Sequence, residues 1–230
     1  MKFYKLENSS NPKEVGVQFH SEELIVSGDI QNDVIPREGR IERAFKLPEP
    51  LLHKKAKRTS LLNVIPVPYH FLVLKNDFID YLEAFEIQEH QKWNITVHQK
   101  SEMLSDYSLF YCPKAYERII IDFSKSVFLI TDGVLFPKKR KEEMAFQDFE
   151  EYFEKRRELI STKSLYLHPQ NLVLDFRYCK EDLIRLHNMP MTGTGYYVSE
   201  RLKHAIEDKG FTGMTFKELT DVDKRIEVIY

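Results

Sequence analysis

One segment near the C-terminal end constrains the fold more than any other, because a strand, a capped helix, a glycine stop and a second strand follow one another there. Tyr196 to Val198 is a short apolar, β-rich run, which predicts a strand. Ser199 is a preferred N-cap residue, and the helix that it begins is predicted over Glu200 to Lys209. Gly210 ends this helix, and Met214 to Phe216 predicts the next strand.

Weaker patterns predict the elements of the first half of the chain. Phe3 to Leu6 is expected to form an opening strand. A helix with its N-cap at Asn76 is expected to run to Phe85, because apolar residues recur there at helical spacing. Trp93 to Val97 alternates apolar and polar residues, which predicts a half-buried strand with Trp93 facing the core, and Tyr107 to Tyr111 is its expected neighbour.

The second half of the chain predicts a mixture of strands and helices. Arg118 to Phe123 and Ser126 to Thr131 are β-rich runs that predict a hairpin. Glu142 to Ile160 carries an apolar stripe among many charges and predicts the longest helix. Two strands and a short helix are then expected at Leu165 to Leu167, at Leu172 to Phe176 and at Lys180 to Leu186, in that order.

Together these elements predict an α+β fold, with a mixed, mainly antiparallel sheet and several short helices packed against it. At 230 residues the chain is long enough to bury a core without a disulfide or a metal. Residues 1–230 are interpreted as a single domain in which residues 1–50 are only loosely assigned. A boundary between two lobes, if the chain has one, is expected in the polar stretch from Pro137 to Glu143.

The charge balance limits the classes of partner. The 34 Lys and Arg residues nearly cancel the 36 Asp and Glu residues, so long-range attraction to nucleic acid or to an anionic membrane is not expected. The N-terminus is charged where a signal peptide needs an apolar run, and no stretch reaches the roughly 18–20 apolar residues of a membrane span. The prediction is a cytoplasmic protein with no nucleic-acid and no membrane partner.

No motif predicts a metal or a cofactor. Cys112 and Cys179 stand far apart without a CxxC pair and are expected to be buried packing thiols, and the eight histidines include no HExxH. Residues 192–196, Thr-Gly-Thr-Gly-Tyr, lack the rest of a phosphate-binding loop and predict a turn before a strand. The basic runs at 54–58 and 138–141 predict solvated loops. No catalytic, cofactor-binding or metal-binding residue is therefore assigned.

Two aspartates offer fragments of an enzyme site. Asp122 with Lys125, and Asp175 with Arg177, are expected at strand ends, where carboxylates can hold a divalent cation and a basic group can stabilise developing charge. The second carboxylate-x-Lys strand of a metal-dependent nuclease is absent. A small metal-dependent enzyme acting on nucleic acid or nucleotides is accordingly kept as an alternative function.

The end of the chain resembles a known family. Tyr196 to Phe216, with Ser-x-x-Leu-Lys at 199–203 and Gly-Phe-Thr-Gly at 210–213, is similar to the ending of bacterial immunity proteins of the polymorphic-toxin systems, the types numbered eleven and forty-three. Tyr69 to Phe85 and the run from Ile119 to Ser126 resemble the middle of that family. The best-matching region is residues 60–217, and the resemblance does not separate the two types.

The resemblance implies a protein that binds and neutralises a cognate secreted bacterial toxin encoded by a neighbouring gene. It implies no catalytic residue and no cofactor, and it assigns no partner-binding residue. A non-catalytic structural or assembly subunit is a further alternative, because a surface rich in aromatic and charged residues can serve any protein interface.

Overall fold

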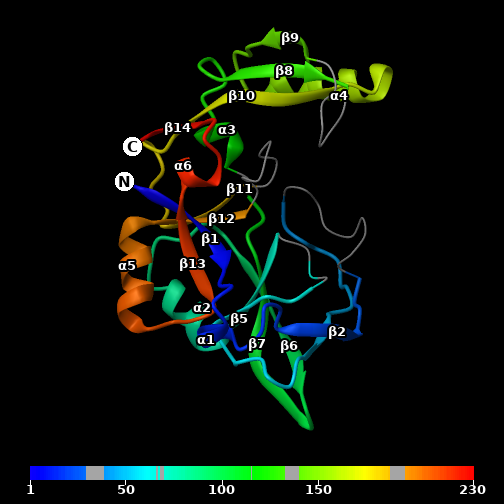
Figure 1. The fold of residues 1–230 in the computed structure, drawn as a ribbon, viewed down its shortest axis with the longest axis vertical. Coiled ribbons are helices and arrows are strands. Elements are labelled where there is room, and N and C mark those ends of the chain that lie inside the picture. The colour runs from blue at the N-terminus through cyan, green and yellow to red at the C-terminus, as the bar shows by residue number, and fades with distance from the viewer. Residues whose placement is uncertain (30–38, 66, 68–69, 115, 133–139, 187–194) are drawn as a thin grey trace.

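Three sheets follow one another along the long axis of the chain in its computed structural model (Figure 1). The structure describes residues 1–29, 39–65, 67, 70–114, 116–132, 140–186 and 195–230. The strands are β1 (Phe3–Asn8), β2 (Ser21–Val26), β3 (Glu49–Leu52), β4 (Leu61–Leu62), β5 (Phe71–Lys75), β6 (Gln91–Gln99), β7 (Glu102–Tyr111), β8 (Val127–Thr131), β9 (Arg140–Met144), β10 (Tyr166–Asp175), β11 (Leu183–Leu186), β12 (Gly195–Ser199), β13 (Met214–Glu218) and β14 (Ile226–Ile229). The helices are α1 (Pro12–Val15), α2 (Asn76–Leu82), α3 (Glu117–Ile120), α4 (Phe149–Lys163), α5 (Glu200–Lys209) and α6 (Leu219–Val222).

We name the sheets by their position in Figure 1. The upper sheet has the order β14-β10-β8-β9, the central sheet β11-β12-β1-β13, and the lower sheet β2-β3-β6-β7-β5-β4. The pairs β3–β6 and β10–β14 are parallel, and the remaining pairs between the described strands are antiparallel. The predicted α+β class with mainly antiparallel strands is confirmed, with the strands divided among three sheets.

The central sheet is covered on both faces. Successive residues of a strand point to opposite faces, and here Tyr196 packs into the core next to the lower sheet while Tyr197 packs into the core next to the upper sheet. Tyr4 and Phe3 of β1 divide between the same two cores. A strand buried on both faces is an uninterrupted apolar run in sequence, as Tyr196 to Val198 is.

The segment after β12 folds as its sequence predicts. Ser199 is the N-cap of α5, and its hydroxyl oxygen accepts a hydrogen bond from the backbone N–H of Leu202 at 3.1 Å. Gly210 ends the helix in the left-handed conformation, with φ of 78°. Gly213, with φ of 93°, turns the chain into β13 so close to β4 that an added Cβ would lie 2.1 Å from the carbonyl oxygen of Leu61.

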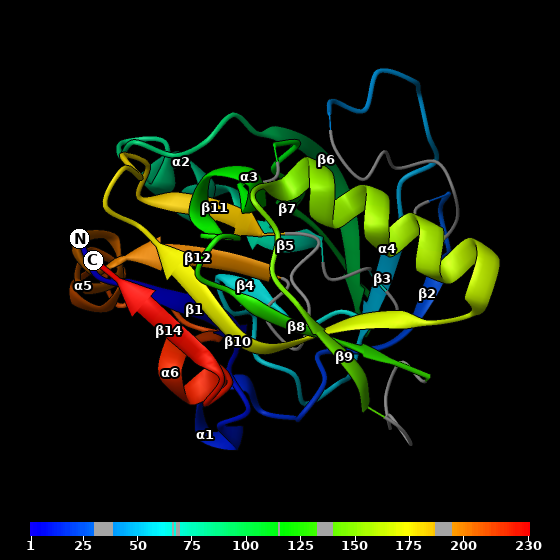
Figure 2. The ribbon, with the colours of Figure 1, turned by 90° about the horizontal axis from the view of Figure 1, so that it is seen from above.

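The N-terminal strand lies in the middle of the central sheet, between β12 and β13. The predicted opening strand is confirmed. Both termini lie at the same edge of the molecule (Figures 1 and 2), where the hydroxyl of Tyr230 donates to the carbonyl oxygen of Phe3 at 3.3 Å. The loosely assigned residues 1–50 thus supply a core strand of the fold.

The expected hairpin from Arg118 to Thr131 is wrong in its first half. Residues 117–120 form one turn of helix, α3, and Ile121 makes a single β-bridge to Leu174, whereas 127–131 form the predicted strand β8. A short run of β-branched residues is ambiguous in sequence. Here Ile120 is buried and Ile119 half-exposed, as on a helical turn, and Ser126 closes a tight turn onto the carbonyl oxygen of Asp122.

The long helix predicted from Glu142 to Ile160 begins later. Asp148 is the N-cap of α4, its side chain accepting from the backbone N–H of Glu151 at 2.9 Å. The residues before it form β9, in which Met144 pairs with Phe128 of β8. Met144 and Phe146 contact the same core as Phe149, which explains the helix-like pattern, but they reach it from an extended chain.

Three further predictions need correction. The two strands expected between Leu165 and Phe176 are one strand, β10, which pairs with β8 as far as Asn171, with a register shift between Pro169 and Asn171, and with β14 from Leu172. The helix expected from Lys180 to Leu186 is instead strand β11, which pairs with β12. The N-cap of α2 is Lys75, and the side chain of Asn76 accepts from the Ser108 hydroxyl at 2.8 Å.

Other expectations concern the middle of the chain and the proposed boundary. Trp93 packs partly buried against a third core, formed by the lower sheet with residues such as Ile41 and Leu52, and its ring meets Phe45 edge-on at 5.1 Å. Of the predicted boundary region, residues 137–139 lie outside the described part and 140–143 belong to β9. Among the helices that the structure describes, none is long and apolar enough to cross a membrane.

Candidate functional site

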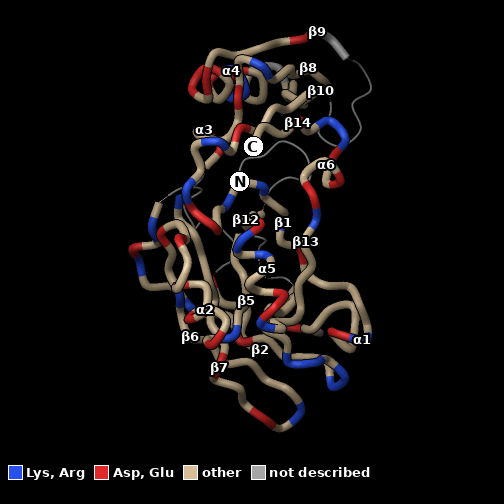
Figure 3. The backbone as a smooth tube through the Cα atoms, turned by 90° about the vertical axis from the view of Figure 1, so that its left-hand side faces the viewer, with Lys and Arg blue, Asp and Glu red and all other residues tan. Residues whose placement is uncertain are grey.

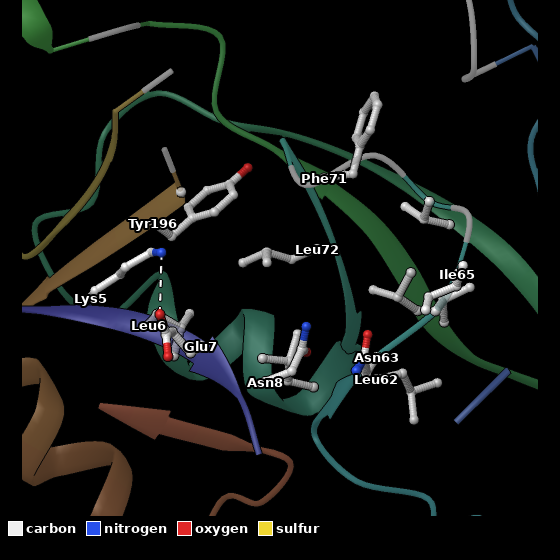
Figure 4. Close-up of a pocket in the computed structure, with 15 residues that line it drawn as sticks. Lys5, Leu6, Glu7, Asn8, Leu62, Asn63, Ile65, Phe71, Leu72 and Tyr196 are labelled. Atoms are coloured by element: carbon white, nitrogen blue, oxygen red, sulfur yellow. Dashed lines mark ion pairs between the residues drawn. The ribbon is translucent and has the colours of Figure 1, made fainter. Parts of the chain in front are cut away.

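A pocket of about 300 Å³ opens where the central sheet meets the lower sheet (Figure 4). One wall consists of residues 5–8 of β1 and the first two residues of β12, 195–196. The other wall consists of residues 61–65 and 67 together with 71–73 of β5. The pocket therefore joins parts of the chain that are far apart in sequence, and the pairing of β1 with β12 brings them together.

One side of the pocket carries a pair of opposite charges. Lys5 and Glu7 are two residues apart on β1, so their side chains leave the strand on the same face. The Lys5 ammonium lies 3.2 Å from the Glu7 carboxylate (Figure 4), and their side chains are 12% and 37% exposed. Both side chains lie on the face of the central sheet that carries Phe3 and Tyr197, opposite to the face that carries the ring of Tyr196.

The other side of the pocket is mostly apolar. The ring of Tyr196 and the side chain of Leu72 face each other there (Figure 4). The Tyr196 hydroxyl donates to the carbonyl oxygen of His70 at 2.8 Å and accepts from the backbone N–H of Cys112 at 3.3 Å. Burial raises the pKa of this phenol well above its usual range, so Tyr196 is a neutral wall of the pocket.

Two large apolar side chains are exposed near the mouth of the pocket. Ile65 lines it and is 47% exposed, and Phe19 is 44% exposed. The residue after Phe19, His20, donates its backbone N–H to the carbonyl oxygen of Asn63, a lining residue, at 3.0 Å. Exposed apolar groups gathered beside a concave site are typical of binding surfaces.

The buried side chain of His20 is hydrogen-bonded to Thr59 and Asn63, beside the second wall of the pocket. Its Nδ1 accepts from the backbone N–H of Asn63 at 3.0 Å, which assigns the hydrogen to Nε2, and Nε2 lies 3.0 Å from the Thr59 hydroxyl. Burial lowers the pKa of His20 to about 4. The imidazole is therefore neutral near pH 7 and serves as a structural link between the two segments.

Asp122 and Asp175, the two aspartates considered from the sequence, lie on adjacent segments of the chain. Asp122 donates its N–H to the carbonyl oxygen of Val173 at 2.9 Å, two residues from Asp175. Each carboxylate already has a cation: Lys125 lies 2.7 Å from Asp122, and Arg177 lies 2.6 Å from Asp175. These hydrogen-bonded cations are the main cause of the lowered pKa of each aspartate, and Lys125 also lowers that of Asp175. The arrangement is two adjoining ion pairs.

The remaining residues considered from sequence do not converge on a site. His90 lies 3.0 Å from Glu83, and His98 lies 2.8 Å from Glu49. Within the part of the chain that the structure describes, no group of three or more His, Cys, Asp or Glu residues is placed to hold a metal ion.

Both cysteines are buried free thiols, as predicted. Burial raises the pKa of each, to about 12 for Cys179, so neither is a thiolate near neutral pH. Cys179 packs in the core between the central and upper sheets, and Cys112 packs in the core between the central and lower sheets.

The glycine motif and the basic runs are described only in part. Gly195 begins β12, as the predicted turn before a strand requires, whereas 192–194 lie outside the described residues. In the run at 54–58 both ends are exposed and Ala56 is buried, and Arg58 pairs with Glu102 at 2.6 Å. Residues 138–139 of the second run lie outside the described part. Positive and negative residues are interspersed along the backbone (Figure 3).

The pocket has no signal in the sequence. Its lining comes from three parts of the chain, residues 5–8, 61–73 and 195–196, and nothing in their sequence indicates that they meet. The alternation of Lys5 and Glu7 with buried Leu6 marks a strand with a polar face, but it does not say what lies opposite. No family model matches the chain, and no curated protein matches it in sequence.

Proposed function

We propose that this chain is an immunity protein that binds and neutralises a cognate secreted bacterial toxin in the cytoplasm. The observation that carries the proposal is the segment from Tyr196 to Phe216, which resembles the ending of immunity proteins of the polymorphic-toxin systems. In the structure this segment is the strand-helix-strand unit at the centre of the fold.

The positions of three residues in this segment support the resemblance to that family. Ser199, Gly210 and Gly213 occupy the N-cap, the helix end and the tight approach to β4, where few other residues serve. A pattern that depends on such positions describes a scaffold. Partner recognition then belongs to the surface, and the pocket with its exposed apolar rim is a suitable place for it.

The proposal is tested with the toxin encoded by the neighbouring gene, made as a catalytically inactive variant. The tagged chain is expected to retain this toxin during purification and to leave behind a toxin of unrelated sequence. Retention of neither toxin would reject the proposed function.

The alternative of a small metal-dependent enzyme has one observation in its favour, the closeness of Asp122 and Asp175. It requires a divalent cation to displace Lys125 and Arg177 from the two carboxylates. Calorimetric titration with Mg²⁺ and Mn²⁺ tests this directly. Binding that is lost in a D122N/D175N variant would favour the enzyme, whereas no heat of binding would favour the immunity protein.

A further inference from the structure

We propose that the surface formed by α1 and by the loop after β3 receives an acidic face of the toxin. This inference rests on the proposed function and assigns its recognition site. It is drawn from four lysines, Lys13, Lys54, Lys55 and Lys57, which we call the lysine cluster.

Two segments that are distant in sequence bring the lysine cluster together. The backbone N–H of Lys57 donates to the carbonyl oxygen of Val15 at 3.0 Å, and the Lys57 ammonium donates to the carbonyl oxygen of Lys13 at 2.6 Å. Gly16 follows α1 so close to the loop that an added Cβ would lie 2.2 Å from the carbonyl oxygen of Lys55. The four lysines therefore belong to one surface, beside α1 (Figure 3).

The lysine cluster is exposed and lacks counter-charges. Among the described residues, no carboxylate lies within ion-pair distance of its four ammonium groups. Glu14, next to Lys13 in the chain, accepts from the N–H of Gly213 at 2.5 Å, and Glu102 pairs with Arg58 at 2.6 Å. Without the cluster the chain has 30 basic and 36 acidic residues, a formal charge of −6. Unopposed like charges repel one another, and an acidic partner removes this repulsion.

The loop that carries three of these lysines is held in place by hydrogen bonds. Ala56 is buried, its N–H donates to the carbonyl oxygen of His53 at 2.9 Å, and its carbonyl oxygen accepts from the Gln99 side chain at 2.8 Å. The N–H of Lys55 donates to Nδ1 of His53 at 3.1 Å. A surface that is already ordered loses little conformational entropy on binding, which favours a specific complex.

Apolar residues beside the lysine cluster indicate a protein partner. The backbone N–H of His53 donates to the carbonyl oxygen of His20 at 2.8 Å, so the chain from α1 to Phe19 runs along the loop. Phe19 and Ile65, the exposed apolar residues near the mouth of the pocket, therefore border the cluster. Protein interfaces combine such apolar contacts with complementary charges.

Four lysines are too few for stable binding to a membrane. Each Lys near an anionic membrane contributes about 1 kcal/mol, so the lysine cluster would bind such a membrane with a Kd of about 1 mM. A protein partner adds apolar contacts with Phe19 to the same charges. A nucleic acid is the other polyanion that the experiment has to separate from an acidic protein.

The first experiment needs no toxin. The full chain, with labelled amide groups, is titrated with a peptide of eight glutamates, with a deoxythymidine octamer and with phosphatidylserine vesicles. The peptide is expected to shift the amide signals of residues 13–19 and 54–58 in a saturable manner at about 20 mM salt, and not at about 500 mM salt. No saturable shift, or shifts scattered over the whole chain, would overturn the inference. Tighter binding of the octamer than of the peptide, or sedimentation of the chain with the vesicles, would overturn it as well.

Two variants of equal net charge test the lysine cluster. K54E/K55E reverses two exposed charges and leaves the hydrogen bond of the Lys57 ammonium in place, so circular dichroism should show an unchanged fold. K180E/K224E is the matched control, because Lys180 and Lys224 are exposed and lie before β11 and β14, outside the cluster. The glutamate peptide is expected to bind K54E/K55E at least tenfold more weakly than K180E/K224E. Equal binding to the two variants would refute the assignment.

The toxin then decides whether the lysine cluster is the recognition site. K54E/K55E is expected to associate with the toxin at least tenfold more slowly than K180E/K224E, because complementary charges act mainly on the association rate. If both variants bind the toxin as the unaltered chain does, the proposed function stands and the assignment of the cluster is wrong. If the unaltered chain binds no toxin while the peptide still binds the cluster, the proposed function fails, and the assignment of the cluster to a toxin fails with it.

Discussion

Replacing Ser199 with alanine is expected to destabilise the fold by far more than the loss of one exposed hydroxyl. The Ser199 hydroxyl is fully buried and makes two hydrogen bonds: it accepts from the backbone N–H of Leu202 at 3.1 Å and donates to Oδ1 of Asp182 at 2.6 Å. Loss of an N-cap costs about 1 kcal/mol. Loss of a donor to a buried carboxylate costs about 1–3 kcal/mol more. We therefore expect S199A to lower the free energy of unfolding by about 2–4 kcal/mol.

The measurement is urea unfolding, followed by circular dichroism, with S161A as the matched control. Ser161 lies on the exposed side of α4 and donates to a carbonyl oxygen in its own helix at 3.3 Å, so S161A is expected to change the free energy of unfolding by less than about 0.5 kcal/mol. S199D separates the two roles of the hydroxyl, since aspartate is a good N-cap but would place a second carboxylate beside Asp182. A cost for S199A no larger than that for S161A, or a stable S199D, would refute the reasoning.

Two further predictions concern the buried histidine His20 and the close approach of Gly213 to β4. Because burial lowers the pKa of His20 from its unfolded value near 6.5 to about 4, the unfolded chain binds more protons in this window. The contribution of His20 to stability should then be complete above pH 6.5 and fall by up to about 3 kcal/mol as the pH drops to 4, and His70, whose pKa burial also lowers to about 4, adds to the fall in the same range. Urea unfolding at several pH values should show that the free energy of unfolding depends less on pH in H20Q than in the unaltered chain. H204Q, which changes an exposed histidine, should leave this pH dependence unchanged. The same pH dependence in the unaltered chain, H20Q and H204Q would contradict the account. G213A should lower the free energy of unfolding by more than about 3 kcal/mol, because the added Cβ would lie 2.1 Å from the carbonyl oxygen of Leu61. G210A should lower it by about 1 kcal/mol, because no atom lies within 4 Å of its Cβ and only the positive φ is unfavourable. Thermal unfolding that ranks the two variants in the opposite order would be inconsistent with the tight approach of Gly213 to β4.

The elements that depend on local chemistry were predictable. The capped helix after Ser199, with its glycine stop, and the alternating strand around Trp93 each carry their signal within about ten residues. The class of the fold followed from these segments. Their boundaries come from hydrogen bonds and turns that involve near neighbours, and a single sequence records such neighbours directly.

The elements that depend on distant partners were not predictable. The sequence predicts two strands on either side of Pro169, yet one strand, β10, runs through it with a bulge, because β8 pairs with the strand as far as Asn171 and β14 pairs with its end. Leu183 belongs to a strand because β12 lies beside it. The pocket fails to appear in the sequence for the same reason, since residues of β1 and of β5 come together there only after two sheets have assembled.

The measurement that tests the central claim most directly is survival of cells that produce the toxin of the neighbouring gene. Cells that also produce this chain should grow as well as cells carrying a catalytically inactive toxin. Death of the cells despite folded, abundant protein would contradict the assignment of this chain as an immunity protein.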